Sequence, residues 1–208
     1  MRKISPSQGI GVALLIAGVG IAGVSAYNLT LGEDLASHQQ QAAAEVVPLV
    51  VPSPSAVTKL AVGEVFAKLY VPRFGEGYVR NIAEGTSLDL VLNTVGIGHY
   101  SSTQMPGEVG NFAIAGHRAG NGGPMRKIDT FVAGDLVYVE TAATRYTYRY
   151  LETKIVPPTD IDVIAPEPTE LTKKSGPGKY LTLTSCTPIY VNSDRIIAWF
   201  EQIEEQPR

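Results

Sequence analysis

The sequence predicts a mainly β domain, a barrel or sandwich of short strands, preceded by one N-terminal membrane helix. From about residue 65 onward, short runs of alternating apolar and polar residues recur between turn signals, and helical periodicity is scarce. Near the N-terminus, an uncharged apolar run of about 19 residues approaches the roughly 20 needed to cross a bilayer. The 208 residues and an apolar content of 44% suit one ordinary domain with appendages.

The apolar run extends from Gly9 to Tyr27, with two basic residues before it and the acidic pair Glu33-Asp34 after it. This charge distribution places the N-terminus in the cytoplasm and the rest of the chain outside. The alternative is a cleaved signal peptide, because Val24-Ser25-Ala26 resembles a signal-peptidase site. We favour a retained anchor, so residues 1–27 are expected to form the cytoplasmic start and a transmembrane signal-anchor helix. The localisation that follows is a single-pass protein of the plasma membrane with an extracellular domain.

Residues 28–64 show no persistent amphipathic pattern and end in a segment where proline and valine alternate. Such a composition favours extended backbone, so we expect a flexible extracytoplasmic stalk with a short helix near Leu35 to Glu45. The folded domain is then expected at residues 65–208.

Turn residues divide this domain into its predicted elements. Thr86 or Ser87 can cap a short helix that continues to about Val95, and the glycine-rich segment Gly96–Tyr100 is expected to break regular structure. A long connection, Pro157–Gly178, precedes the last two strands. The predicted strands are Phe66–Val71, Tyr78–Ile82, Asn111–His117, Leu136–Glu140, Thr144–Val156, Tyr180–Cys186 and Arg195–Phe200.

The only cysteine, Cys186, ends one of these strands, which excludes an intramolecular disulfide. By strand periodicity its thiol lies on the face opposite Leu181 and Leu183, away from the expected core. Pro188 ends the strand, and Arg195 opens the next one. If the two strands are neighbours, Arg195 returns close to Cys186.

A free thiol has a pKa of about 8.5 and needs a base to act as a nucleophile at neutral pH. His117 follows a strand beside glycines, where side chains face clefts, whereas His38 lies in the expected stalk. Cys186 as nucleophile, His117 as acid and base, and Arg195 as oxyanion cation form a complete acyl-transfer set. The alternative for each residue taken singly is a structural role.

Two other classes of function are disfavoured by the sequence. A metal site would combine Cys186, His99 and His117, but no short ligand spacing such as His-x-x-x-His is present, and no cofactor is expected. The net charge of −3 and the lack of long basic runs argue against nucleic-acid binding.

Two motifs resemble the sortases, the membrane-anchored cysteine transpeptidases of Gram-positive cell surfaces. Thr182-Leu-Thr-Ser-Cys186, with an arginine nine positions later, resembles the family's cysteine strand, and Ala115-Gly-His117-Arg118 resembles its histidine segment. Pro106–Phe112 and Gly123–Asp129 are similar to class E, the branch typical of actinobacteria. Ser185 stands where the family usually has threonine, and Thr187 where class E often has histidine.

The resemblance implies an eight-stranded β-barrel with short helices and a two-step reaction. A C-terminal sorting signal of the Leu-Pro-x-Thr-Gly or Leu-Ala-x-Thr-Gly kind is cut after threonine, and Cys186 keeps the acyl group as a thioester. Arg195 holds the substrate and its oxyanion. His117 protonates the leaving amine and then deprotonates the incoming amine of a peptidoglycan precursor or pilin lysine.

Three further residues are candidates for substrate binding. Thr184 and Tyr190 flank the thiol on the strand and in the following loop. His99 resembles a family position near the active site, and we expect a supporting role for it. A packing role remains the alternative for all three.

Two other functions stay open at this point. An L,D-transpeptidase also uses cysteine, histidine and arginine, but its arginine follows the cysteine by two positions rather than nine. The non-enzymatic alternative is an anchored β-domain that binds a wall component and carries an unreactive Cys186.

Overall fold

Eight strands and one long helix dominate the part of the chain that the structure describes. The structure is a computed structural model that describes residues 6–49, 60–169 and 177–208. Its long helix is α1 (Pro6–Val46). The strands are β1 (Val65–Tyr70), β2 (Val79–Glu84), β3 (Ile97–His99), β4 (Gly110–Gly116), β5 (Leu136–Thr141), β6 (Thr144–Val156), β7 (Lys179–Thr187) and β8 (Asp194–Pro207). The short helical turns are η1 (Pro72–Phe74), η2 (Leu88–Leu92), η3 (Ile128–Thr130) and η4 (Asp162–Ile164).

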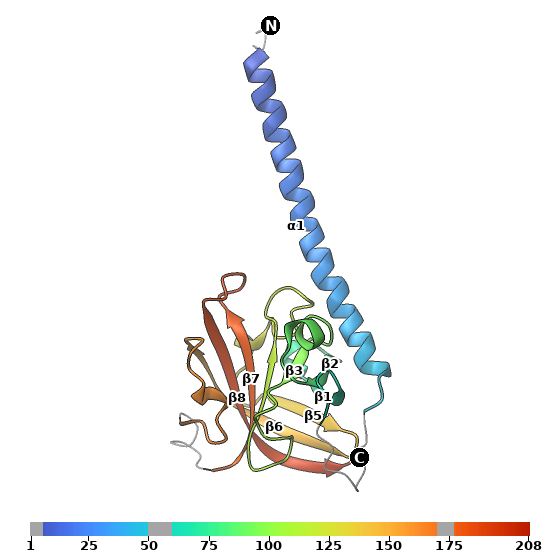
Figure 1. Ribbon diagram of the computed structural model, residues 1–208, viewed down its shortest axis with the longest axis vertical. Helices are drawn as coiled ribbons and strands as arrows, with labels where there is room; N and C mark the ends of the chain where they lie inside the picture. The colour runs from blue at the N-terminus through green and yellow to red at the C-terminus, as the bar shows by residue number, and fades with distance from the viewer. Residues whose placement is uncertain (1–5, 50–59, 170–176) are drawn as a thin grey trace.

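The strands close into a barrel in the order β1-β2-β3-β4-β7-β8-β6-β5, and β5 pairs back with β1 (Figure 1). The pairs β2–β3 and β4–β7 are parallel, and the other neighbours are antiparallel. Closure pairs the backbone N–H and C=O groups that the edge strands of an open sheet leave unpaired. The predicted eight-stranded barrel is therefore confirmed.

Apolar side chains from alternate strand positions fill the barrel interior. Leu181 and Leu183 of β7 belong to this core, with Phe112 of β4 and Phe200 of β8. The intervening β7 residues therefore face outward, as the alternation predicted. The predicted strands at residues 136–140 and 144–156 are confirmed as β5 and β6, which pair as an antiparallel hairpin.

The segment from Gly96 to Tyr100 was expected to lack regular structure, and this prediction is wrong. It contains strand β3, which lies between β2 and β4. A Cβ atom at Gly98 would come within 2.2 Å of the carbonyl oxygen of Gly85. The glycine therefore marks a close approach of two backbone segments rather than a break. Ser87 caps the preceding turn as expected, since its Oγ accepts from the Leu90 amide.

The helix predicted near Leu35 to Glu45 is present, but it is longer than expected. All of residues 28–46 are helical, so the flexible stalk predicted for the rest of this range is wrong. They continue α1 from the apolar run, and the lower half of the helix lies beside the barrel (Figure 1). Its inward face carries Glu33, Ser37, Gln40 and Ala44, spaced by four, three and four residues. This helical stripe is polar or small rather than apolar, so hydrophobic periodicity did not indicate that this face docks on the barrel. The proline-rich residues 50–59 lie outside the described residues.

The upper half of α1 extends away from the barrel (Figure 1). Large apolar side chains from Leu14 to Tyr27 are at least 60% exposed there. This helix is long and apolar enough to cross a membrane. Its exposed surface is the kind that a bilayer would cover.

Candidate active site

Three strands bring the predicted catalytic residues into one row. Cys186 of β7 pairs directly with Arg195 of β8. On the other side of β7, Ala115 of β4 pairs with Thr184 in parallel register. β4 ends at Gly116, and extending the same register by two residues places His117 beside Cys186.

Two side-chain contacts show that this register continues past the paired residues. The Ser185 hydroxyl donates to the Gly116 carbonyl oxygen at 2.8 Å, and Arg118 Nη1 donates to Thr187 Oγ1 at 2.6 Å. Both pairs have the same sequence separation of 69 residues. Since neighbouring strands lie about 4.8 Å apart, the imidazole, thiol and guanidinium share one short row.

The row of His117, Cys186 and Arg195 lies on the outer face of the barrel, close to the end of β7. Cys186 is half-buried. Outward-facing residues earlier on β7 and later on β8, such as Tyr180 and Trp199, are covered by the β6–β7 connection. Trp199 of β8 lies under this cover and donates its indole N–H to the Val163 carbonyl oxygen at 3.1 Å. Thr184, two residues before the cysteine, is only 5% exposed, and its hydroxyl lies 3.1 Å from the Tyr100 hydroxyl. Thr184 therefore offers almost no exposed side-chain surface for a substrate to contact.

His117 is half-buried and oriented by an amide. Its Nε2 lies 2.9 Å from Asn93 Oδ1, which also accepts from Asn121 Nδ2 at 2.9 Å. An amide oxygen only accepts, so Nε2 carries the proton and Nδ1 remains the basic nitrogen of the neutral ring. Burial lowers the pKa of His117 below its usual value. Sequence reasoning missed Asn93, because a polar residue after a short helix gives no distinguishing signal.

Arg195 is held by backbone carbonyls of the β7–β8 loop. Its Nη1 donates to the carbonyl oxygens of Asn192 at 3.2 Å and Asp194 at 2.9 Å. Within the described residues, these are its only hydrogen bonds, so Nε and Nη2 remain for a ligand. Tyr190 in the same loop is 72% exposed and has a positive φ of 67°. The loop thus fixes the guanidinium and exposes the aromatic ring of Tyr190.

The two departures from the expected motif both have partners. Ser185 needs only its hydroxyl to bond Gly116, so the missing methyl group leaves this contact intact. Thr187 accepts from Arg118, which is 7% exposed and also pairs with Asp129 at 2.6 Å. Arg118, which follows His117, therefore hydrogen-bonds to Thr187, which follows Cys186.

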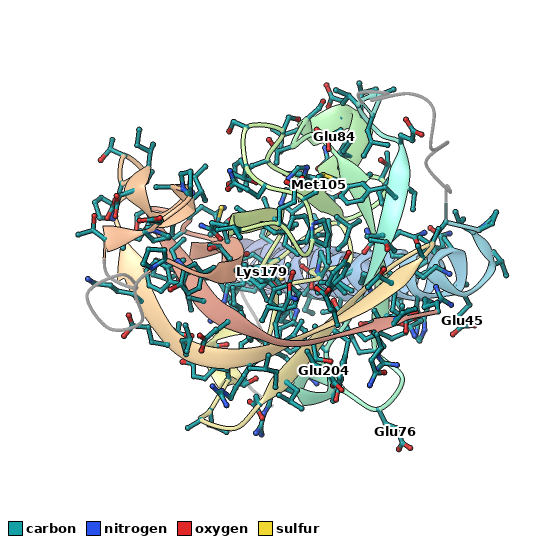
Figure 2. The ribbon with its side chains drawn as sticks, turned by 90° about the horizontal axis from the view of Figure 1, so that it is seen from below. Glu45, Glu76, Glu84, Met105, Lys179 and Glu204 are labelled. Carbon is teal, nitrogen blue, oxygen red and sulfur yellow. The ribbon has the colours of Figure 1, made fainter. Side chains whose placement is uncertain are left out.

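His99 lies apart from the row. It is 2% exposed and packs against Phe66 and Phe112 of the core, while its Nδ1 lies 2.7 Å from Glu84 Oε2. Its Nε2 faces the Gln104 carbonyl oxygen at 3.2 Å. Glu84, the carboxylate partner of His99, is labelled in Figure 2. Since Cys186 is on the outer face, His99 is not placed to share a metal ion or a bound substrate with it.

A closed eight-stranded barrel that presents a thiol, an imidazole and a guanidinium in one row has the architecture of a barrel transpeptidase. The comparisons with known proteins agree. Residues 69–203 match the sortase domain family. Sortase SrtE1 of Streptomyces coelicolor is 38% identical over 152 residues, which cover 70% of this chain and 42% of that protein. Sortase SrtE2 of the same organism is 34% identical over 146 residues, covering 66% of this chain and 56% of its own length.

Solved structures show the same likeness. Sortase E from Streptomyces avermitilis superposes with a TM-score of 0.64 at 36% identity, covering 71% of this chain and 93% of that one. Sortase E1 from Streptomyces coelicolor, solved with a tripeptide in the active site, gives 0.65 at 37% identity, covering 70% and 92%. The chain belongs to the sortase family, a family of transpeptidases. It spans about half the length of the two curated relatives.

Proposed function

We propose that this protein is a membrane-anchored cysteine transpeptidase. It cleaves a C-terminal sorting signal of the Leu-Pro-x-Thr-Gly or Leu-Ala-x-Thr-Gly kind between threonine and glycine, and it transfers the shortened protein to an amine. α1 anchors it in the plasma membrane with the N-terminus in the cytoplasm and the barrel outside. The proposal is supported by the strand register, which pairs Cys186 with Arg195 and Ala115 with Thr184, so that the histidine two residues after Ala115 follows beside the thiol.

In the first step, Nδ1 of His117 takes the proton of the Cys186 thiol, and Sγ attacks the threonine carbonyl carbon to form a tetrahedral intermediate. The free donors of Arg195 bind its oxyanion, where a fixed cation stabilises developing charge. His117 transfers a proton to the glycine nitrogen, so the C–N bond breaks and a thioester remains on the enzyme. The departing peptide leaves as a free amine.

In the second step, the amine of a peptidoglycan precursor or of a pilin lysine attacks the thioester carbonyl. His117 accepts the proton of this amine, and the thiolate leaves to regenerate Cys186. The lowered pKa of His117 suits this step because the ring is neutral and basic at neutral pH. The product is an amide bond to the new partner.

A short peptide substrate is favoured by two observations. The related sortase E1 structure holds a tripeptide in its active site. In this chain, Tyr190 is exposed in the loop that follows the cysteine strand, and Thr184 precedes the thiol by two residues on that strand. We assign Tyr190 and the backbone around Thr184 to substrate contact, whereas His99 supports the barrel interior.

The decisive experiment incubates the full chain in detergent with a panel of Leu-x-x-Thr-Gly peptides and glycine or diaminopimelate as the amine. Mass spectrometry should find the peptide acyl group attached to Cys186 and the transferred product. Cys186→Ala should abolish both. His117→Ala should slow turnover about 10²–10⁴-fold, the usual worth of a general acid and base.

Matched controls are available for His117 and Arg195. His38→Ala removes an exposed histidine of α1, and Arg149→Met removes an arginine of β6 whose side chain is 52% exposed. Both should keep wild-type turnover, whereas Arg195→Met should not. Product formation by Cys186→Ala at the wild-type rate would refute the mechanism. A folded chain whose Cys186 resists a methanethiosulfonate reagent would favour the non-enzymatic alternative.

A further inference from the structure

The lower half of α1 is bound to the barrel by specific polar contacts. Arg80 of β2, which is only 3% exposed, donates from Nη2 to Ser37 Oγ at 2.7 Å and from Nη1 to Gln41 Oε1. Gln41 also accepts from the Val79 amide at 3.1 Å and donates to the Gly77 carbonyl oxygen at 2.6 Å. A buried guanidinium that finds its acceptors on the helix needs the helix in place.

The same helix face reaches the loop that follows His117, residues 118–123. Glu33 accepts from the Gly120 amide at 2.5 Å and pairs with Arg126. Gln40, which is 6% exposed, donates from Nε2 to the Asn121 carbonyl oxygen at 3.0 Å. A Cβ atom at Gly122 would lie 2.9 Å from both Gln40 Oε1 and the Ser37 amide nitrogen, so the loop touches the helix closely.

This loop continues the contact inward to the catalytic histidine. Asn121 donates from Nδ2 to Asn93 Oδ1, the same oxygen that accepts from His117 Nε2, both at 2.9 Å. Gln40 is thus connected to His117 through Asn121 and Asn93. Asn121 has a positive φ of 46°, a conformation that a non-glycine residue keeps only when its surroundings hold it.

We propose that Gln40 and Glu33 are positioning residues for His117, and that the docked half of the membrane helix is part of the catalytic unit. This inference rests on the proposed transpeptidase function. The helix holds the loop, the loop holds Asn93, and Asn93 fixes the ring of His117.

The docking also orients the site. The β7–β8 loop lies at the end of the barrel from which the free part of α1 extends (Figure 1), and Tyr190 lines the same cavity as Thr30. Thr30 is three residues past the apolar run, about 4.5 Å along the helix axis. The catalytic end therefore opens toward the membrane surface, where a membrane-bound substrate presents its cleavage site.

The test uses isosteric pairs of variants in the full chain. Gln40→Glu removes the donor to Asn121, and Gln39→Glu makes the same change at the exposed neighbour. Glu33→Gln removes the carboxylate that binds the loop, and Asp34→Asn makes the same change at the next, exposed position. We expect Gln40→Glu and Glu33→Gln to lower kcat at least threefold with KM unchanged, and the neighbours to match wild type.

A second readout does not depend on a substrate. The carbon and proton NMR signals of the His117 ring should shift in Gln40→Glu and stay in place in Gln39→Glu, with the melting temperature of the barrel recorded for both. An unchanged ring signal together with an unchanged kcat overturns the inference. A raised KM at constant kcat also overturns it, because the helix would then act in substrate binding. If wild type cleaves no peptide, the proposed function fails, and the ring signal still decides whether the helix positions His117.

Discussion

Replacing Thr187 by valine tests the contact that joins the histidine segment to the cysteine strand. Thr187 Oγ1 accepts from Arg118 at 2.6 Å, and both residues are buried. Valine keeps the shape of threonine and removes the acceptor, so a buried guanidinium loses one partner. A hydrogen bond to a charged group contributes about 1.5–3 kcal/mol to the free energy of unfolding. At about 2–4 °C per kcal/mol for a domain of this size, the melting temperature should fall by about 3–12 °C.

The assay is denaturant unfolding of the full chain, with Thr187→Ser as the matched control that keeps the hydroxyl. Thr187→Val should lower the free energy of unfolding by the amount above, and Thr187→Ser by under about 1 kcal/mol. A double-mutant cycle with Arg118→Leu isolates the pair, since valine should cost little once the guanidinium is gone. Because Thr187 adjoins Cys186, kcat should fall as well. Equal stabilities of the valine and serine variants would show that the contact stabilises nothing.

Four shorter predictions follow from the same site. The lowered pKa of His117 should set the acid limb of the kcat/KM profile below pH 6.5, the usual histidine value, and a limb above it would contradict the burial effect. The same shift stabilises the fold fully above pH about 6.5, and this stability is lost as pH falls toward the folded pKa, which a pH series of unfolding curves can measure. Arg195→Lys should reduce kcat/KM about 10²-fold or more in the peptide assay, because lysine keeps the charge but not the fork of donors. Ser185→Ala should lower the free energy of unfolding by about 1 kcal/mol through loss of its bond to Gly116, while Ser185→Thr should not.

Much of the site could be predicted from the sequence because its elements follow local rules. The alternation around Leu181 and Leu183 predicted which face of β7 points into the barrel, and therefore the outward direction of Cys186. The turn at Pro188 returned the chain so that Arg195 pairs with Cys186. Asn93 could not be found this way, since its only distinction is a hydrogen bond to a residue 24 positions away.

The sequence by itself determined the β-rich fold, the membrane-length helix and the identities of thiol, imidazole and guanidinium. Periodicity and turn chemistry record these features because each depends on residues close together in the chain. Only the tertiary structure decided that β4 and β7 are parallel neighbours, that His99 lies inside the barrel, and that α1 docks beside His117. The physical reason is that strand pairing and polar docking join residues 69 or 81 positions apart, and no local pattern specifies such partners.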